Sequence, residues 1–453
     1  MDIKSVQTIF LALLYLAIHS SSFAQAKEEL PIIMSSRWFH PRDDKDTLST
    51  LKMIKDFHPD RIDWMYCSNT KQLEEIRKLG VPYSLAINPQ IPDSAGYTVQ
   101  GRIEDLNGQK VVAPWMKSWN QKNPYWGCVN SPEFQKLFLA KSKEIVDLKA
   151  YGIFVDDARF NDHAFEWGGC FCDHCISGFN KYLVNEVKKD SIDPSFNYKD
   201  YRLSRSKNTS NAKNARDPYA KLFKDFQQSS VVRFLTKWKA DLKAYAGNDF
   251  VFLTNNPNGS WNKIYEIFDS GICEISANNR SYESLERISK QAKAKNKTQV
   301  LSIATSDSTT FKRLSVYSYS LGNPVLLPWD LMLQPTSERS EARRIYFDGK
   351  NWIDHSMLLR SLYKTSTLKP SVSAGKRELC GDARVLTFAK DGKKVTVFLP
   401  DLRDKKPKCN IGNVGRRIHL SELSEISNNA RLKSASRSKV SFQNDADIDI
   451  YLE

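Results

Sequence analysis

The sequence predicts an α/β fold, a (β/α)8 barrel followed by a small antiparallel β domain. Short runs rich in β-branched and aromatic residues alternate with amphipathic helical windows, which is typical of a parallel sheet. Eight such strand-like runs precede residue 330, the number that closes a barrel. From about residue 371 the runs become short and alternating, and Asp391-Gly392 between two of them is a strong hairpin signal. We therefore expect a barrel over residues 27–370 and a β-sandwich-like domain over residues 371–453.

The predicted barrel strands are short and mostly apolar, as buried parallel strands are. We place them at residues 32–36, 61–66, 83–87, 153–156, 250–254, 272–276, 300–304 and 325–327. Helical windows between them lie at residues 47–57, 71–79, 132–148, 219–245, 281–294 and 311–321. In the C-terminal domain, strands are predicted at residues 384–389, 394–399 and 447–452.

Polar and aromatic residues follow every predicted strand. In a barrel these positions gather at the carboxyl ends of the strands, where barrel enzymes build their sites. Turn chemistry also enriches Asn and Asp at strand ends, so any one of these residues has a structural interpretation, but their coincidence at eight strands favours a site. We predict substrate-binding roles for Arg37, Trp38, His40, Asn88, Arg159, Asn255, Trp329 and Asp330.

The first 26 residues have the features of a secretory signal peptide. Lys4 precedes an apolar stretch at residues 9–18, and Ala24-Gln25-Ala26 fits the small-x-small cleavage rule. We expect this segment to be removed and the mature chain to be secreted or periplasmic. No later window offers about 18 consecutive apolar residues, so no membrane span is expected.

The chain has 453 residues, of which 41% are hydrophobic, and a formal net charge of +15. This hydrophobic content is ample for a large core. The positive charge favours an anionic partner, whether a sulfated or uronic polysaccharide, nucleic acid or a membrane surface. Lys and Arg are spread along the chain without a dense basic run, which is equally typical of a solvated basic surface. Nothing in the pattern favours nucleic acid over the other partners.

Two long insertions interrupt the regular alternation, at residues 88–131 and 188–216. The first is rich in aromatic residues, whose faces suit stacking on sugar rings but could equally pack the loop onto the barrel rim. The second is polar, so we expect a mobile excursion or a lid. The aromatic residues of the first insertion are Tyr97, Trp115, Trp119, Tyr125 and Trp126.

Three closely spaced cysteines, Cys170, Cys172 and Cys175, suggest a metal site. Disulfides are the usual state of cysteines in an exported protein and remain the alternative here. These three are too close to pair comfortably with one another, and their spacing suits tetrahedral zinc. Cys128 is the expected fourth ligand, with His174 in reserve. The other four cysteines are expected to form one disulfide, Cys380 with Cys409, and two buried thiols, Cys67 and Cys273.

The segment from about residue 126 to 182 resembles the zinc-bearing loop of the glycoside hydrolase family 42 β-galactosidases. The resemblance rests on Cys128, then a strand with the spacing Gly152-x-x-x-Asp156, then Cys-x-Cys-x-x-Cys-x-x-x-Phe, ending at Phe179. The rest of the barrel agrees only in architecture. The resemblance implies a zinc ion with a structural rather than a catalytic role.

The acidic residues depart from that family. Hydrolysis of a glycosidic bond normally takes two carboxyl groups, a proton donor and a nucleophile or base. The resemblance would place the acid/base Glu at Ala158, which cannot transfer a proton. The seventh predicted strand ends in Thr305-Ser306-Asp307 and lacks the nucleophilic Glu. The similarity therefore does not extend to β-galactosidase activity.

The fourth strand is instead similar to that of retaining barrel glycosidases with an Asp nucleophile, and of hydrolases with a double Asp there. This resemblance implies Asp156 as the nucleophile or water-orienting base, with Asp157 as the alternative. In Asp-nucleophile barrels the acid often comes from the sixth strand, where this chain has Glu274 among apolar residues, so we expect it to be desolvated. Asp307 and Asp330 compete for the same role, although each could be a turn or helix-cap residue.

We therefore expect an exported glycoside hydrolase that acts on a polysaccharide or oligosaccharide, of which anionic or sulfated chains suit the net charge. Two-carboxylate catalysis with retention is favoured. The alternative is a carbohydrate-binding barrel that has lost turnover, which the alanine at position 158 makes plausible.

Overall fold

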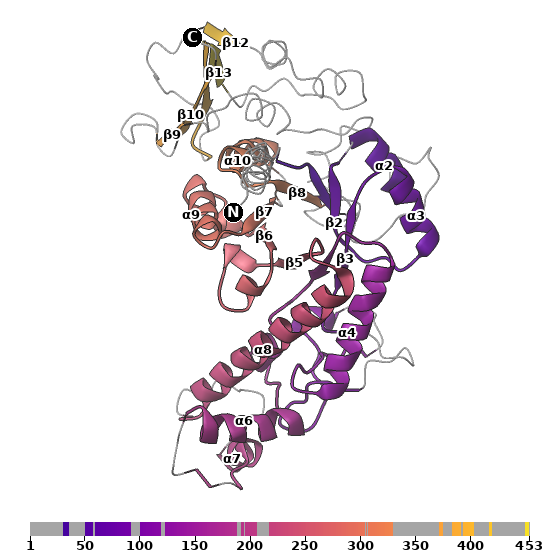
Figure 1. Cartoon of the computed structure of the whole chain (residues 1–453). Helices are drawn as coiled ribbons and strands as arrows, with labels where there is room; N and C mark the ends of the chain where they lie inside the picture. Colours follow the sequence, from indigo (N-terminus) through magenta and orange to yellow (C-terminus); the bar gives the residue numbers. More distant parts are fainter. Residues whose placement is uncertain are drawn as a thin grey trace, which may run out of the picture.

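The computed structural model describes residues 30–35, 50–57, 59–91, 100–118, 123–187, 192–193, 195–205, 217–303, 305, 307–328, 371–374, 383–390, 393–402, 416–418 and 449–452. Eight parallel strands form a closed barrel in chain order, because β1 pairs with both β2 and β8 (Figure 1). They are β1 (Ile33–Ser35), β2 (Arg61–Met65), β3 (Tyr83–Ile87), β4 (Gly152–Val155), β5 (Val251–Asn255), β6 (Ser270–Ile275), β7 (Thr298–Ile303) and β8 (Val325–Pro328).

Helices join most of these strands, and several begin at residues suited to capping. Asn69 accepts hydrogen bonds from the first-turn amides of α3, and Ser131 and Ser281 do the same for α4 and α9. The described helices are α2 (Thr50–Phe57), α3 (Thr70–Lys78), α4 (Pro132–Asp147), α5 (Phe160–Phe165), α6 (Asp173–Asn185), α7 (Tyr198–Arg205), α8 (Ala220–Ala246), α9 (Tyr282–Ala294) and α10 (Ser308–Ser320). None of them is long and apolar enough to cross a membrane.

Each predicted barrel strand overlaps its observed counterpart, and the predicted fold class is confirmed. The insertion at residues 188–216, for which a mobile excursion or a lid is predicted, contains the helix α7 at Tyr198–Arg205. Tyr198 is fully buried, and Arg202 forms a buried ion pair with Asp217 at 2.9 Å. The polar composition of this segment concealed an apolar face that packs on α6.

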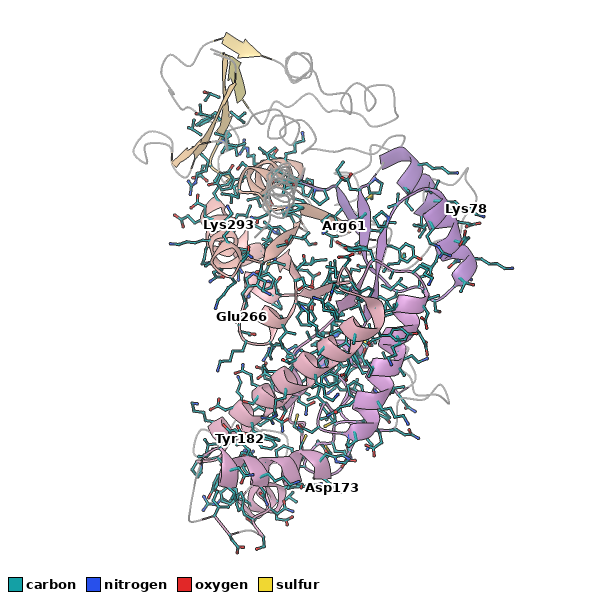
Figure 2. The ribbon with its side chains drawn as sticks, in the orientation of Figure 1. Arg61, Lys78, Asp173, Tyr182, Glu266 and Lys293 are labelled. Atoms are coloured by element: carbon teal, nitrogen blue, oxygen red, sulfur yellow. The ribbon has the colours of Figure 1, made fainter. Side chains whose placement is uncertain are left out.

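Helices α6 and α7 and the first half of α8 project beyond the barrel as a lobe (Figure 1). Helix α5 packs against α8 and contributes to the same lobe. Figure 2 labels Asp173 and Tyr182 on this lobe, far from Arg61 on β2. The lobe has its own hydrophobic core, which includes Phe179 and Phe223 together with the buried cysteines described below. This core is therefore separate from the hydrophobic clusters that pack the barrel.

The C-terminal strands form one antiparallel sheet in the order β12-β13-β11-β10-β9. The C-terminal domain contacts the barrel helices α9 and α10. On α9, Tyr282 donates a hydrogen bond to Pro400 O at 2.8 Å and Glu286 pairs with Arg384 at 2.8 Å, and on α10 Arg313 donates to Asp401 O at 3.0 Å. The domain limits at residues 26 and 370 remain predictions. The strands are β9 (Ser371–Ala374), β10 (Arg384–Lys390), β11 (Lys393–Leu399), β12 (Arg416–Ile418) and β13 (Asp449–Leu452).

Candidate active site

Nearly every barrel strand contributes one side chain to an enclosed cluster in the barrel interior. Its members are Ile33, Trp64, Phe154, Leu253, Ile272, Val300 and Leu326, with Ala86 of β3 packed against them. Because side chains alternate along a strand, the residue two positions later faces the same interior, one step nearer the carboxyl ends. For the first seven strands that step is Ser35, Tyr66, Asn88, Asp156, Asn255, Glu274 and Ser302. We call these seven residues the mouth layer.

Strand β4 delivers Asp156 to the mouth layer. Gly152 at its start lies so close to β5 that a Cβ there would be 2.5 Å from the Val251 carbonyl oxygen, so a larger residue would push the two strands apart. The register then runs without a shift from Gly152 to Val155. Asp156 follows with the same orientation as Phe154, which points inward.

The Asp156 carboxylate accepts hydrogen bonds from two aromatic side chains. Its Oδ2 accepts from Trp64 Nε1 at 3.2 Å and from Tyr66 OH at 2.8 Å. Tyr66 OH in turn accepts from Asn88 Nδ2 at 3.4 Å. Burial and the neighbouring Asp156 raise the pKa of Tyr66 well above its ordinary value, so the phenol keeps the proton that it donates. These donors stabilise an ionised Asp156 and fix its orientation.

Trp64 reaches Asp156 through an unusual backbone conformation. Its φ of 62° lies in the left-handed region, which a bulky residue rarely adopts, and the β2–β3 register shifts at this point. Its backbone N donates to Ser84 Oγ at 3.2 Å, and this hydroxyl donates to the buried Asp63 at 3.1 Å. The indole stacks on Phe154, with ring centroids 4.7 Å apart. A strained residue held by a buried polar network is a common feature of functional sites.

Asp157 ends β4 in a different conformation, with a φ of 54°. Its backbone N donates to Asn255 Oδ1 at 3.0 Å. Asn255, for which a substrate-binding role is predicted, therefore holds the turn that contains Asp156 and Asp157. Ala158 is fully buried in the core between barrel and helices. The position where the family resemblance would place an acid therefore does not face the mouth.

Glu274 shares the register of the inward-facing Ile272 on β6 and lies beside Ser302 of β7. The prediction that its apolar neighbours desolvate it is wrong, because its side chain is exposed. Cys273 and Ile275 are buried because they face the helices, whereas Glu274 faces the open end of the barrel.

Asp307 has a capping role in the structure. It is the N-cap of α10, and its oxygens accept from the backbone N of Thr309 at 3.2 Å and of Thr310 at 3.3 Å. Its Oδ2 also accepts from the Thr310 hydroxyl at 2.5 Å. The helix-cap interpretation therefore accounts for this residue.

Two further predicted binding residues are engaged within the protein. Arg159 pairs with Asp162 at 2.7 Å and with Glu166 at 2.8 Å, both within or beside α5. Asn88 accepts from Gln90 N at 2.9 Å, which shapes the loop after β3. The remaining predicted residues lie outside the described part of the chain: Arg37, Trp38, His40, Trp329 and Asp330, and also Cys380 and Cys409.

The predicted zinc ligands cluster behind the β4 turn. The sulfur atoms of Cys128, Cys172 and Cys175 all lie within 4.8 Å of one another. Cys128 Sγ is 3.5 Å from Cys172 Sγ and 3.4 Å from Cys175 Sγ. A disulfide would need about 2.05 Å, whereas Zn–S bonds of about 2.3 Å in a tetrahedron place sulfurs about 3.8 Å apart. In the structure these sulfurs are too far apart for disulfides, and their spacing is compatible with ligands of one metal ion.

Amide donors surround the cluster. Asn161 Nδ2 donates to Cys128 Sγ at 3.5 Å and to Cys175 Sγ at 3.4 Å, and Asn130 Nδ2 donates to Cys175 Sγ at 3.3 Å. Such donors stabilise thiolates, as the outer groups around metal ligands do. Burial raises the pKa of Cys128 and Cys175, so without a metal both would be protonated thiols.

Cys170 does not belong to the group of three cysteines whose sulfur atoms all lie within 4.8 Å of one another. It is buried with a left-handed φ of 76°, and its thiol interacts with Cys175 and donates to Asn161 O at 3.2 Å. The reserve ligand His174 is excluded, because it is exposed and lies 3.5 Å from Glu133. Cys273 is a buried free thiol as predicted, whereas Cys67 is free but only partly buried, contrary to the prediction.

Sequence reasoning missed Trp64 and Tyr66 as site residues. Strand alternation alone does not reveal them, because it would place Trp64 on the same side as Ile62, which belongs to the core between barrel and helices. The register shift between Ile62 and Met65 turns Trp64 towards the barrel interior instead. Both residues lie within the second predicted strand and not after its end, where the predicted substrate-binding residues lie.

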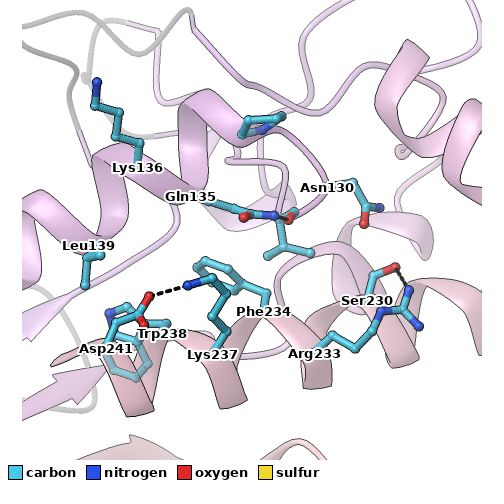
Figure 3. Close-up of a pocket in the computed structure, with 12 residues that line it drawn as sticks. Asn130, Gln135, Lys136, Leu139, Ser230, Arg233, Phe234, Lys237, Trp238 and Asp241 are labelled. Atoms are coloured by element: carbon cyan, nitrogen blue, oxygen red, sulfur yellow. Dashed lines mark hydrogen bonds and ion pairs between the residues drawn. The ribbon is translucent and has the colours of Figure 1, made fainter. Parts of the chain in front are cut away.

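A separate groove of about 440 Å³ runs between α4 and α8, outside the barrel (Figure 3). It has an apolar floor that includes Phe234 and Trp238, and cationic side chains on α8. Lys237 pairs with Asp241 at 2.7 Å, and Arg233 donates to Ser230 at 3.2 Å. These cations have local partners, and the groove shares no lining residue with the mouth layer.

No protein-family model matches the chain, and no curated protein matches it. Several solved structures are similar to it at low identity. The glycoside hydrolase domain of PelA from Pseudomonas aeruginosa is 11% identical with a TM-score of 0.37, over 66% of this chain and 96% of that one. A β-galactosidase from Marinomonas ef1 is 8% identical with a TM-score of 0.48, over 68% and 55%. Amy13B from Eubacterium rectale is 9% identical with a TM-score of 0.46, over 87% and 90%.

Proposed function

We propose that the protein is a glycoside hydrolase whose active site is the mouth layer of the barrel. The observation that carries this proposal is the setting of Asp156. Its carboxylate projects from the end of β4 toward the barrel opening and is held there by Trp64 and Tyr66. An acid fixed by two donors at the carboxyl end of a barrel strand is suited to attack or to base catalysis.

Glu274 is the proposed second carboxyl group. It faces the same opening from β6, two strands away from β4, which corresponds to a separation of roughly 10 Å between the strand axes. Side chains reaching inward from these strands can flank one glycosidic bond, with Glu274 as proton donor and Asp156 as nucleophile or base. Asp157 is the alternative for the second role, and a retaining mechanism is the one we favour.

The proposed substrate is a polysaccharide or oligosaccharide outside the cytoplasm. The signal-like residues 1–26 support export, and the net charge of +15 supports an anionic chain such as a uronic or sulfated glycan. The exposed position of Glu274 supports a site that is open to a large substrate.

The cysteine cluster is proposed to hold one structural zinc ion, with Cys128, Cys172 and Cys175 as ligands and Cys170 as the fourth. A zinc ion bound there in tetrahedral geometry would link the segment before α4 to the segment before α6. Asn161 lies one residue after the start of α5 and bonds two of the sulfurs, so the cluster also supports the turn that carries Asp156.

Release of reducing sugar separates this function from the alternative, a carbohydrate-binding barrel without turnover. The wild-type protein should release reducing ends from at least one polysaccharide in a panel of neutral, uronic and sulfated chains. Asp156→Asn should abolish the release while the protein still binds the chain. If both proteins bind equally and neither releases sugar, the protein is a binding barrel.

A further inference from the structure

A group of aromatic side chains lies beyond the mouth layer, on the segment after β3 and at the end of α5. The Trp115 ring meets Trp126 and Trp167 edge to face, with centroids 6.0 and 5.0 Å apart, and lies 5.4 Å from His163. Trp126 is fully buried and donates its Nε1 to Phe160 O at 3.2 Å, so packing explains it. Trp115 is 38% exposed, so part of its ring is accessible to a ligand.

Trp167 also forms one wall of a cavity of about 450 Å³. This volume lies within the range of roughly 300–1,000 Å³ that is typical of ligand sites. The other walls carry Asp105, Gln109, Lys110 and Lys117. The cavity therefore combines an aromatic surface with charged and amide groups.

The polar groups of the cavity are held in place. Asp105 Oδ1 accepts from the backbone N of Asn107 at 2.8 Å and of Gln109 at 2.9 Å. Lys110 pairs with Glu104 at 2.6 Å. A sugar ring has apolar C–H faces and hydroxyl groups around its edge, so an aromatic wall with fixed polar groups beside it matches both parts of the ring.

The cavity lies on the same side of the barrel as Asp156. Helix α5 begins at Phe160, three residues after Asp157, and Trp167 follows its end. The six residues of α5, about 9 Å of helix, lie in the chain between the acid pair and Trp167. One ligand could occupy both places only if it were a chain of several sugar units.

We propose that the cavity walled by Trp167, with Trp115 beside it, is a distal binding site for a polysaccharide chain. Sugar binding at this site does not depend on catalysis, but its role in extending an active site rests on the function proposed above. The site would favour long chains over short glycosides, because only long chains gain its contacts.

Native electrophoresis in gels containing a polysaccharide tests the binding. The probes are polygalacturonate and chondroitin sulfate as anionic chains, and xylan and mixed-linkage β-glucan as neutral chains. The full mature protein carrying Asp156→Asn, which prevents loss of the probe, should be retarded by at least one of them. Adding Trp115→Ala should weaken that retardation roughly two- to tenfold, the range expected for one aromatic contact. Tyr245→Ala is the matched control, because Tyr245 is an exposed aromatic residue on α8, and it should leave retardation unchanged.

The outcomes separate this proposal from the proposed function. If no probe retards the protein, or if Trp115→Ala and the variant of the cavity wall, Gln109→Ala, are both retarded like their parent, the distal site is overturned even where the wild type releases sugar. If Trp115-dependent retardation occurs and no sugar is released from any probe, the distal site stands and the hydrolase proposal fails. Gln109→Ala offers a second variant at an exposed position, and it should also weaken retardation.

Discussion

At the scale of single residues, the hydrogen bonds to Asp156 distinguish it from Asp157. Two adjacent carboxylates have the same chemistry in the sequence. In the structure Trp64 and Tyr66 donate to Asp156, while Asp157 lies in a left-handed turn whose backbone is held by Asn255. The difference in role that we propose follows from these contacts.

Removing one donor to Asp156 should slow the reaction without abolishing it. Tyr66→Phe deletes the 2.8 Å hydrogen bond but keeps the ring. A hydrogen bond to a charged group contributes about 1.5–3 kcal/mol, so we expect kcat to fall roughly 10- to 100-fold with a smaller change in KM. Tyr83→Phe is the matched control, because its hydroxyl bonds the Leu148 carbonyl away from the mouth, and it should leave kcat unchanged. Equal kinetics for Tyr66→Phe and the wild type would contradict the role given to Tyr66.

His163 should make stability depend on acid pH. Burial, aided by Arg159, lowers the pKa of His163 from 6.5 to about 4. Between these values the unfolded chain binds a proton that the folded protein does not, so stability is lost as the pH falls from 6.5 towards 4. His163→Phe keeps an aromatic ring beside Trp115 and Trp167, and its melting temperature should fall less between pH 7 and pH 5 than that of the wild type. The exposed His174→Gln is the control, and an identical fall in all three proteins would refute the assignment.

The sequence predicted the inward orientation of Asp156 and Glu274, but not their exposure or their hydrogen-bond partners. Strand period alone places Asp156 and Glu274 on inward-facing positions. It does not reveal that Glu274 is exposed, because exposure depends on how far the strand extends past the interior cluster. The contact between Trp64 and Asp156, 92 residues apart in the chain, depends on a strand irregularity that has no sequence signature here.

At the scale of elements, the cysteine cluster joins the start of α4 to the start of α6. Cys128 lies just before α4, and Cys172 and Cys175 lie at the beginning of α6. Asn161 on α5 bonds two of the sulfurs, so three helices meet at this cluster. Loss of the cluster should therefore destabilise the lobe formed by α5, α6, α7 and the first half of α8.

Metal analysis of the purified protein should find one zinc per chain. Cys175→Ser should lose the metal and have a lower melting temperature. Removal of one zinc ligand weakens metal binding, and the free energy of metal binding stabilises the fold. Cys273→Ser changes a buried free thiol outside the cluster and should keep the zinc. Zinc-free wild-type protein with cysteine pairs resistant to alkylation would show that disulfides form instead.

The helices around the barrel were predictable where they had an amphipathic period and a cap. Helix α3 is one example, because Asn69 caps it and Leu73 and Ile76 are its buried residues. Helices α5 and α6 were missed because α5 has only six residues and α6 begins within the cysteine motif. Helix α6 has an apolar period at Cys175, Ile176, Phe179 and Leu183, but this period starts inside a motif that predicts a metal-binding loop. Helix α5 is too short to show a period.

At the scale of the whole molecule, closure of the barrel brings the site together. Strands β2 to β6 are separated in the chain by insertions and by the lobe, yet the mouth layer collects one residue from each. Eight strand-like runs were sufficient to predict this closure, because few other folds accept eight parallel strands in chain order. The lobe could not be predicted as a unit, since its core draws on four helices and on the segment after β3.

The central claim is that Asp156 performs the chemistry and Asp157 supports the turn. The most direct test compares kcat of Asp156→Asn, Asp157→Asn and the capping-residue variant Asp307→Asn on a polysaccharide that the wild type cleaves. Loss of a catalytic carboxylate should lower kcat by at least about 10²–10⁴-fold, so we expect this loss for Asp156→Asn and changes of less than about tenfold for the other two. Near wild-type turnover by Asp156→Asn, or a larger loss in Asp157→Asn, would contradict the account.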